Sequence, residues 1–216
     1  GVVLDELDRL WQRMGDVTEP PQSIKQNWDA IKWWLGRNIS GSTMAVQSID
    51  LLPFVQRTAE RYRALTPHRR VTIETEGEND LFISIDPVIL REVCDGLVKN
   101  AVENTPDGGT VRITVEQKDD NILLHVADSG GGITEENQKS VFDGLFHTEE
   151  TALYTSKRPL EFGAGGKGLE LMRMNMYGRR FGFEVAVRSN RCPFLTSRGD
   201  MCPGDTSLCP HLKHPD

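Results

Sequence analysis

The sequence predicts an α+β fold, a two-layer α/β sandwich preceded by an N-terminal helical segment. Helical and strand patterns alternate between residues 51 and 190, and short turns join strand-like runs. Each helix and each sheet has one apolar face, and stacking the two layers covers both faces. We divide the chain into a helical dimerisation or linker segment at 1–50, a central domain at 51–190, and a Cys-Pro-rich tail at 191–216.

Composition limits the function classes. The 216 residues suffice for one domain and an accessory segment, and 38% hydrophobic with 26% charged residues is typical of a globular chain. No run of about 18 apolar residues occurs, so a membrane link would come only from segments upstream of this chain. The net charge of −7 argues against a nucleic-acid partner. The four cysteines do not form a disulfide framework pattern, which favours the cytoplasm.

The first fifty residues predict two helices. Apolar residues recur at spacings of three and four on both sides of Pro20-Pro21, a pair that breaks one helix and can begin the next. Each helix would bury one apolar stripe, either on its own domain or against a second copy of the chain. We expect a homodimer through these helices. The stripes are Leu4, Leu7, Trp11 and Met14, then Ile24, Trp28, Ile31 and Leu35.

The central domain opens with a helix that Thr66-Pro67 ends and continues with two short strands around an acidic turn at 76–80. Asp86-Pro87 begins a long helix, because proline suits the first helical turn. Two strands with regular alternation follow, and a glycine-rich stretch leads into a last helix after Gly168. The predicted helices are 51–65 and 86–104, and the predicted strands are 71–75, 81–85, 110–116, 121–128 and 183–188.

Asn100 is the first candidate site residue. It lies among apolar residues at helical spacing (Leu90, Val93, Leu97 and Ala101), where a polar amide is costly without a partner. An amide that reaches a metal ion or a phosphate would resolve this conflict. A solvent-facing asparagine is the alternative.

Two glycine-rich segments provide the remaining sequence evidence for a ligand-binding site. Asp128 ends a strand and is followed by Ser129-Gly130-Gly131-Gly132-Ile133, in which the carboxylate can accept a hydrogen bond from an exocyclic amine such as that of adenine. The glycines let the backbone approach a flat ligand closely. Gly163-Ala164-Gly165-Gly166-Lys167-Gly168-Leu169 runs into a helix, whose free N–H groups suit phosphates.

These three segments, in this order, resemble the N, G1 and G2 boxes of the GHKL (Bergerat-fold) ATPases, and specifically those of sensor histidine kinases. Val141-Phe142-Asp143-Gly144-Leu145-Phe146 resembles the F box of the same family. Asn104-Thr105-Pro106-Asp107-Gly108-Gly109 matches the usual exit from the N-box helix. The resemblance covers about residues 50–190.

The resemblance implies ATP and Mg²⁺ as ligands and assigns roles by position. Asn100 would coordinate Mg²⁺ at the phosphates, and Asp128 would read adenine. Residues from about 134 to 163 would form a mobile lid, in which Lys157 and Arg158 are candidate catalytic cations. The nucleotide-binding set would be Asn100, Asn104, Asp128, Gly130, Gly132, Ile133, Gly165, Gly166, Gly168 and Leu169.

Three positions depart from the family pattern. Gly96 stands where histidine kinases often carry a second asparagine and where hydrolases such as gyrase carry the glutamate that activates water. Glu103 replaces a common lysine, and Glu170 replaces a common glycine. The missing glutamate favours a kinase over a hydrolase, whereas the added negative charges predict weak nucleotide binding.

The phospho-acceptor is not evident. None of the five histidines lies in the predicted N-terminal helices or is followed by an acidic residue. We therefore expect γ-phosphate transfer to a histidine outside this chain and then to a response regulator receiver domain. Two alternatives stay open, a nucleotide-sensing or docking pseudokinase and an anti-sigma serine kinase of the same fold.

The tail has its own candidate site. Cys192, Cys202 and Cys209 each precede proline, and His211 is close in sequence. Three thiolates and one imidazole can form a tetrahedral zinc site, although these spacings are wider than in C-x₂-C pairs. An iron–sulfur cluster and free thiols are the alternatives. Cys94, by contrast, is predicted to be a core residue.

Overall fold

The computed structural model describes residues 45–142, 158–164, 169–195 and 200–212. Residues Val46–Asp216 belong to one compact unit. The helices predicted within residues 1–44 lie outside the described residues. In the part of the chain that is described, no helix has the length and apolar character needed to cross a membrane.

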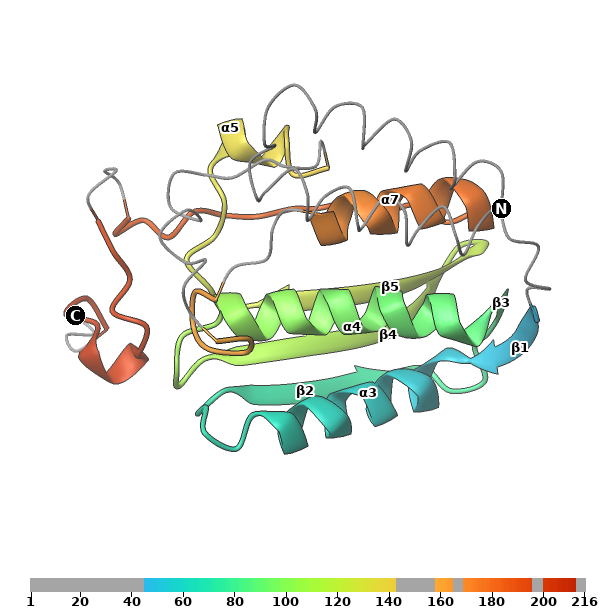
Figure 1. Cartoon of the computed structure of the whole chain (residues 1–216), viewed down its shortest axis with the longest axis horizontal. Helices are drawn as coiled ribbons and strands as arrows, with labels where there is room; N and C mark the ends of the chain where they lie inside the picture. The colour runs from blue at the N-terminus through green and yellow to red at the C-terminus, as the bar shows by residue number, and fades with distance from the viewer. Residues whose placement is uncertain (1–44, 143–157, 165–168, 196–199, 213–216) are drawn as a thin grey trace, which may run out of the picture. The chain divides into compact units, whose positions relative to one another are not determined.

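The described residues form two small sheets (Figure 1). β1 (Gln47–Asp50) pairs antiparallel with β3 (Phe82–Ile85). β2 (Thr72–Gly77), β4 (Thr110–Lys118) and β5 (Asn121–Asp128) form the other sheet in the order β2-β4-β5, with β2 parallel and β5 antiparallel to β4. The acidic turn at 76–80 therefore joins two different sheets and is not the turn of a hairpin. The sequence did not predict β1.

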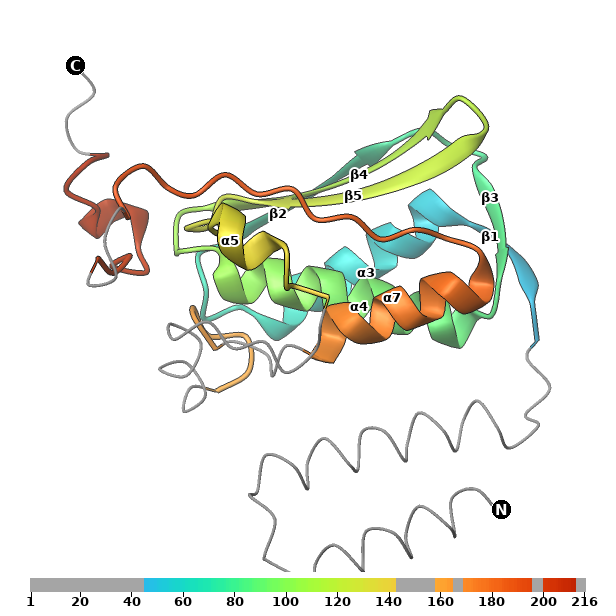
Figure 2. The same ribbon diagram turned by 90° about the horizontal axis from the view of Figure 1, so that it is seen from above.

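The helices form the second layer. α3 (Leu51–Leu65), α4 (Pro87–Asn104) and α7 (Leu169–Phe181) lie on one face of the strands, as the view from above shows (Figure 2). A single turn of helix, α5 (Glu135–Gln138), and a 3₁₀ turn, η1 (Thr206–Leu208), complete the described elements. The predicted two-layer sandwich is confirmed.

The core lies between these layers. Val111, Ile113 and Val115 alternate along β4 and are at most 1% exposed, because they point from the central strand onto the helices. Val98 and Val102 on α4 meet them from the other layer and are equally buried. Burying each such side chain contributes about 1.5–3 kcal/mol relative to exposure.

The predicted strand at Phe183–Arg188 is not formed. Its side chains alternate between half-buried and exposed, as in a strand, but its backbone makes no ladder hydrogen bonds with the described strands. The preceding helix ends at Phe181, because Gly182 adopts φ +75° and both Gly182 and Phe183 donate to the Gly178 carbonyl. The alternating pattern is therefore present, whereas pairing with β5 is not.

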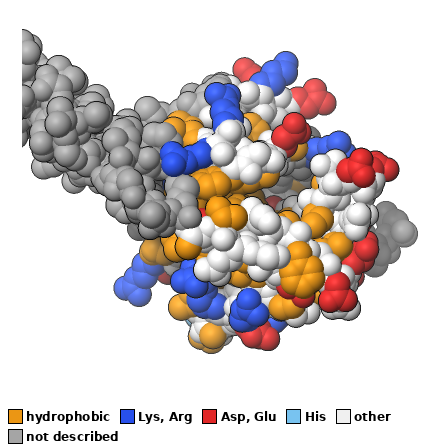
Figure 3. All heavy atoms as spheres, turned by 90° about the vertical axis from the view of Figure 1, so that its right-hand side faces the viewer, with side chains coloured by type: hydrophobic (Ala, Val, Ile, Leu, Met, Phe, Trp, Pro, Cys, Tyr) orange, Lys and Arg blue, Asp and Glu red, His pale blue; other side chains and the backbone are white. Residues whose placement is uncertain are grey.

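Seen from the right-hand side of Figure 1, hydrophobic side chains surround a hollow in the middle of the face, and charged side chains lie around it (Figure 3). Between the layers, a narrow gap is lined by Val55, Cys94, Val98, Leu124 and Val126, among others. Cys94 itself is a core residue, as predicted, and burial raises the pKa of its thiol to about 12.

Candidate functional site

Helix α4 carries the two candidate asparagines on its last turns. The helix begins at a capped end, where the Asp86 carboxylate accepts the Val88 N–H at 2.8 Å and Pro87 occupies the first turn. Asn100 is half-buried, and no described residue hydrogen-bonds to its side-chain amide. Asn104 donates its side-chain N–H to the Asn100 carbonyl at 2.7 Å. The Asn100 amide is therefore available to a ligand.

The end of β5 lies directly against the end of α4. The Asp128 carboxylate accepts the Gly130 N–H at 2.9 Å through Oδ1, and no described residue bonds to its other oxygen. A Cβ on Gly130 would lie 2.5 Å from the Asn104 carbonyl oxygen, so only glycine permits this approach. Desolvation raises the pKa of Asp128, and the Gly130 hydrogen bond opposes that rise. The structure thus brings Asn104, Asp128 and Gly130 together.

Gly132 permits a close contact within the chain, whereas the sequence predicted a close approach to a flat ligand. It has φ +69°, and an added Cβ would lie 2.0 Å from the Asn190 carbonyl oxygen. The next residue, Ile133, donates its N–H to the Ser189 hydroxyl at 2.8 Å. The close approach that Gly132 permits is therefore to the chain's own backbone where the tail begins, at Asn190 and Arg191.

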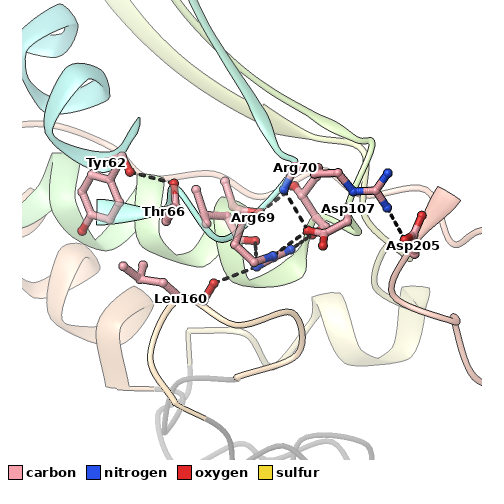
Figure 4. Close-up of polar contacts among 10 residues, drawn as sticks. Tyr62, Thr66, Arg69, Arg70, Asp107, Leu160 and Asp205 are labelled. Atoms are coloured by element: carbon pink, nitrogen blue, oxygen red, sulfur yellow. Dashed lines mark hydrogen bonds and ion pairs between the residues drawn. The ribbon is translucent and has the colours of Figure 1, made fainter. Parts of the chain in front are cut away.

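A cluster around Leu160, which the sequence did not reveal, lies beneath the end of α4. Glu103 is 2% exposed, and its Oε1 accepts the Leu160 N–H at 3.0 Å. The Arg69 guanidinium donates to the Leu160 carbonyl at 2.7 Å and to the Asp107 carboxylate at 2.6 Å (Figure 4). Both backbone polar groups of Leu160 are thus bound by buried charged side chains. Nothing in the local sequence near Arg69 or Asp107 marks this cluster.

The departures from the family pattern have structural partners. Lys99 lies between the two glutamates, with its Nζ 3.2 Å from Glu170 and 3.8 Å from Glu103. Gly96 is buried, and a Cβ there would lie 2.3 Å from the Met174 methyl group. Helix α7 therefore packs over Gly96, and one lysine lies within ion-pair distance of both glutamates.

Several predicted site residues fall outside this arrangement. Lys157, Gly165, Gly166 and Gly168 lie outside the described residues. Leu169 is the first residue of α7. Arg158 is exposed, and its backbone N–H donates to the Glu161 carboxylate at 3.4 Å.

The predicted zinc site is not formed. Cys192, Cys202, Cys209 and His211 are all described and half-buried or exposed. Nowhere in the described ranges do three or more potential ligands gather closely enough to hold a metal ion. His211 stacks instead on Phe194, with the ring centroids 3.9 Å apart. The order of these residues along the tail did not determine their placement in space.

Comparison with known proteins identifies the domain. Residues 85–201 match the family described as histidine kinase-, DNA gyrase B-, and HSP90-like ATPases. The alginate biosynthesis sensor protein KinB of Pseudomonas aeruginosa is 26% identical over 149 residues, covering 68% of this chain and 23% of KinB. The chemotaxis protein CheA of Rhizobium meliloti is 26% identical over 222 residues, covering 87% of this chain and 29% of CheA. The chain thus spans less than a third of either relative.

A solved structure agrees on the fold. The catalytic domain of histidine kinase ThkA superposes with a TM-score of 0.52 at 22% identity, covering 64% of this chain and 84% of that one. The matched family covers α4, the Asp128 segment and α7, which are the elements that carry the candidate site. This chain therefore belongs to the family of histidine kinase-, DNA gyrase B-, and HSP90-like ATPases, with an ATP-binding catalytic domain of the histidine kinase type.

Proposed function

We propose that this domain binds Mg²⁺-ATP and transfers the γ-phosphate to a histidine outside this chain, from which a response regulator receives it. The supporting observation is Asn100, a half-buried amide on α4 that no described residue hydrogen-bonds. A relative named as a sensor histidine kinase, WalK of Bacillus subtilis, supports the same activity. The Asn100 side chain fits the ligand, because an amide oxygen is a ligand that Mg²⁺ accepts alongside phosphates and water.

The roles follow from chemistry and placement. Asn100 would hold Mg²⁺, and Asp128 would accept the adenine amine through the oxygen that Gly130 leaves open. Phosphoryl transfer depends on positioning and on charge neutralisation, and bound Mg²⁺ supplies part of that neutralisation. Lys157 and Arg158 are the candidate cations for the rest of the charge neutralisation. The imidazole nitrogen forms its bond to the γ-phosphorus as the bond to the bridging oxygen breaks, which releases ADP.

Position 96 favours transfer to a side chain over hydrolysis. A general base must lie within hydrogen-bond reach of the water that it activates. Gly96 has no side chain, and Met174 covers it. We propose that water is therefore a poor acceptor at this site.

Partners and location complete the proposal. We propose a homodimer through the predicted N-terminal helices, and a response regulator receiver domain as the phosphate acceptor downstream. The four cysteines are free thiols, which favours the reducing cytoplasm.

Calorimetric titration with a non-hydrolysable ATP analogue tests the site. Asn100→Ala is expected to weaken binding at least tenfold in Mg²⁺, about 1.4 kcal/mol, because it removes a metal ligand. In EDTA the difference from the wild-type chain should vanish, since the amide acts through the metal. Asn79→Ala, at an exposed turn, is the matched control and should bind as the wild type does.

Two results would contradict the proposal. The first is no binding by the wild-type chain at millimolar analogue, which would favour a docking module. The second is equal affinity of the wild-type and Asn100→Ala chains in Mg²⁺, which would remove Asn100 from the site.

A further inference from the structure

The C-terminal tail is bound to the turn that follows α4. The Asp107 N–H donates to the Gly204 carbonyl at 2.9 Å, and the Thr206 N–H donates to the Asp107 carbonyl at 2.8 Å. The Arg70 guanidinium forms an ion pair with the Asp205 carboxylate (Figure 4). The glycine at 108 lets the tail come this close, since an added Cβ would lie 2.1 Å from the Thr206 hydroxyl. Residues 204–206, here called the tail clip, are thus fixed at the exit of α4.

The tail clip shares Asp107 with Arg69. The Asp107 backbone binds the clip, while its carboxylate binds the Arg69 guanidinium, which is 5% exposed. Arg69 in turn donates to the Thr105 and Leu160 carbonyls, both at 2.7 Å. One buried cation therefore connects the residue that holds the clip to Leu160.

A second contact is direct. Gly204 adopts φ +75°, and a Cβ placed on it would lie 2.7 Å from Cδ1 of the Phe162 ring. The ring therefore lies against the backbone of the clip. Only glycine combines this φ with this contact.

The segment at 160–164 leads into the glycine-rich loop assigned to the phosphates. Its conformation depends on outside support, because Leu160 has φ +70°, which is unfavourable for a residue with a side chain. Glu103 binds the segment from one side, accepting the Leu160 N–H through its carboxylate and the Gly163 N–H through its carbonyl. Arg69 donates to the Leu160 carbonyl, and Gly204 of the tail clip lies against Phe162.

We infer that the tail clip is a positioning element of the nucleotide site, which holds residues 160–164 through Asp107-Arg69 and through Phe162. The start of the tail acts on the other glycine-rich segment, because the Cys192 N–H donates to the Gly131 carbonyl and Arg191 donates to the Gly132 carbonyl, both at 2.9 Å. The tail thus contacts the chain next to both glycine-rich segments. Its effect on nucleotide affinity rests on the proposed function.

Gly204→Ala tests the inference in the full chain. The new Cβ meets Phe162, so the clip should separate from residues 160–164. Amide hydrogen exchange at Leu160 and Gly163 should accelerate at least tenfold without nucleotide, and affinity for the ATP analogue should fall about three- to tenfold. Gly182→Ala is the matched control, because Gly182 has the same φ of +75° and its new Cβ would meet no described atom within 4 Å.

Asp205→Asn provides a second variant that adds no atoms in the contact. It removes the charge that Arg70 binds, and it should accelerate exchange at Leu160 and Gly163 in the same direction. Asp120→Asn, in the exposed turn between β4 and β5, is its control and should leave both amides unchanged.

The exchange data separate the possible failures. The inference is overturned if the Asp107 and Thr206 amides exchange faster in Gly204→Ala, which reports release of the clip, while Leu160, Gly163 and affinity stay unchanged. Absence of nucleotide binding by the wild-type chain would instead refute the proposed function. In that case exchange at Leu160 and Gly163 still decides whether the clip positions the segment.

Discussion

Glu103 is a carboxylate that folding removes from water. From the family resemblance we expected it to add negative charge near the phosphates. In the structure it is buried at the end of α4, where Oε1 accepts the Leu160 N–H and Oε2 has no described partner. Burial raises the pKa of Glu103, and the nearby Glu170 raises it further, whereas the Leu160 hydrogen bond, Lys99 and Arg69 lower it. Its role here is to hold a backbone segment.

Glu103→Gln should change how stability depends on pH. Because the folded-state pKa lies above the ordinary value of about 4.3, the folded protein binds the proton more tightly than the unfolded chain. The stability that this tighter proton binding contributes is complete below the unfolded-state pKa of about 4.3. It is lost as pH rises through the folded-state pKa. Urea unfolding of the wild-type chain between pH 4 and 7 should show this loss, and Glu103→Gln should reduce it. An identical pH dependence in both chains would show that Glu103 titrates normally.

At the scale of elements, α4 and α7 form the helix pair that carries the site. Their approach depends on Gly96, over which Met174 packs at 1% exposure. Lys99 and Glu170 add a salt bridge between the same two helices at 3.2 Å. The absence of a side chain at position 96 is therefore also explained by packing, beside the effect on hydrolysis that we propose.

Gly96→Asn, which installs the residue common in histidine kinases, should destabilise the chain. The new side chain overlaps Met174 in a close-packed interface, and overpacking typically costs about 1–3 kcal/mol. Met174→Ala should restore part of that loss in the double variant, because it opens space above position 96. Urea unfolding of the four chains measures the coupling, and strictly additive effects would show that the two residues do not meet.

At the scale of the whole described unit, Arg69 connects segments that are distant in sequence. It lies between α3 and β2, and it binds the end of α4, the turn at Asp107 and Leu160. Through Asp107 it also reaches the tail clip. Its loss should therefore affect several parts of the domain together.

Arg69→Gln should lower the free energy of unfolding by about 2–4 kcal/mol, because it leaves the Asp107 carboxylate without its charged partner in a largely buried place. The matched control is Arg112→Gln. Arg112 pairs with Glu74 on the exposed face of the sheet, where an ion pair contributes at most about 1 kcal/mol. Equal losses in both variants, measured by urea unfolding, would show that Arg69 behaves as a surface residue.

Helices α3 and α4 could be predicted from the sequence alone. Helices α3 and α4 occupy the predicted residues to within one position, because Pro87, Thr66 and the apolar periodicity act over a few neighbouring residues. The proximity of Asn104, Asp128 and Gly130 was also predictable, since a known family arranges these boxes in one order. The prediction of a strand at 183–188 was wrong. The alternation of its side chains indicates which of them are buried and does not indicate whether the backbone pairs with another strand.

Only the tertiary structure determined how the site is supported. Glu103 and Leu160 are 57 residues apart in sequence, Arg69 and Leu160 are 91 apart, and Arg70 and Asp205 are 135 apart. No spacing rule reaches over such separations, because these contacts form when the packed layers bring distant turns together. For the same reason, the sequence showed Gly96 and Glu103 only as departures from the family pattern. In the fold, Gly96 packs against Met174 and Glu103 binds Leu160.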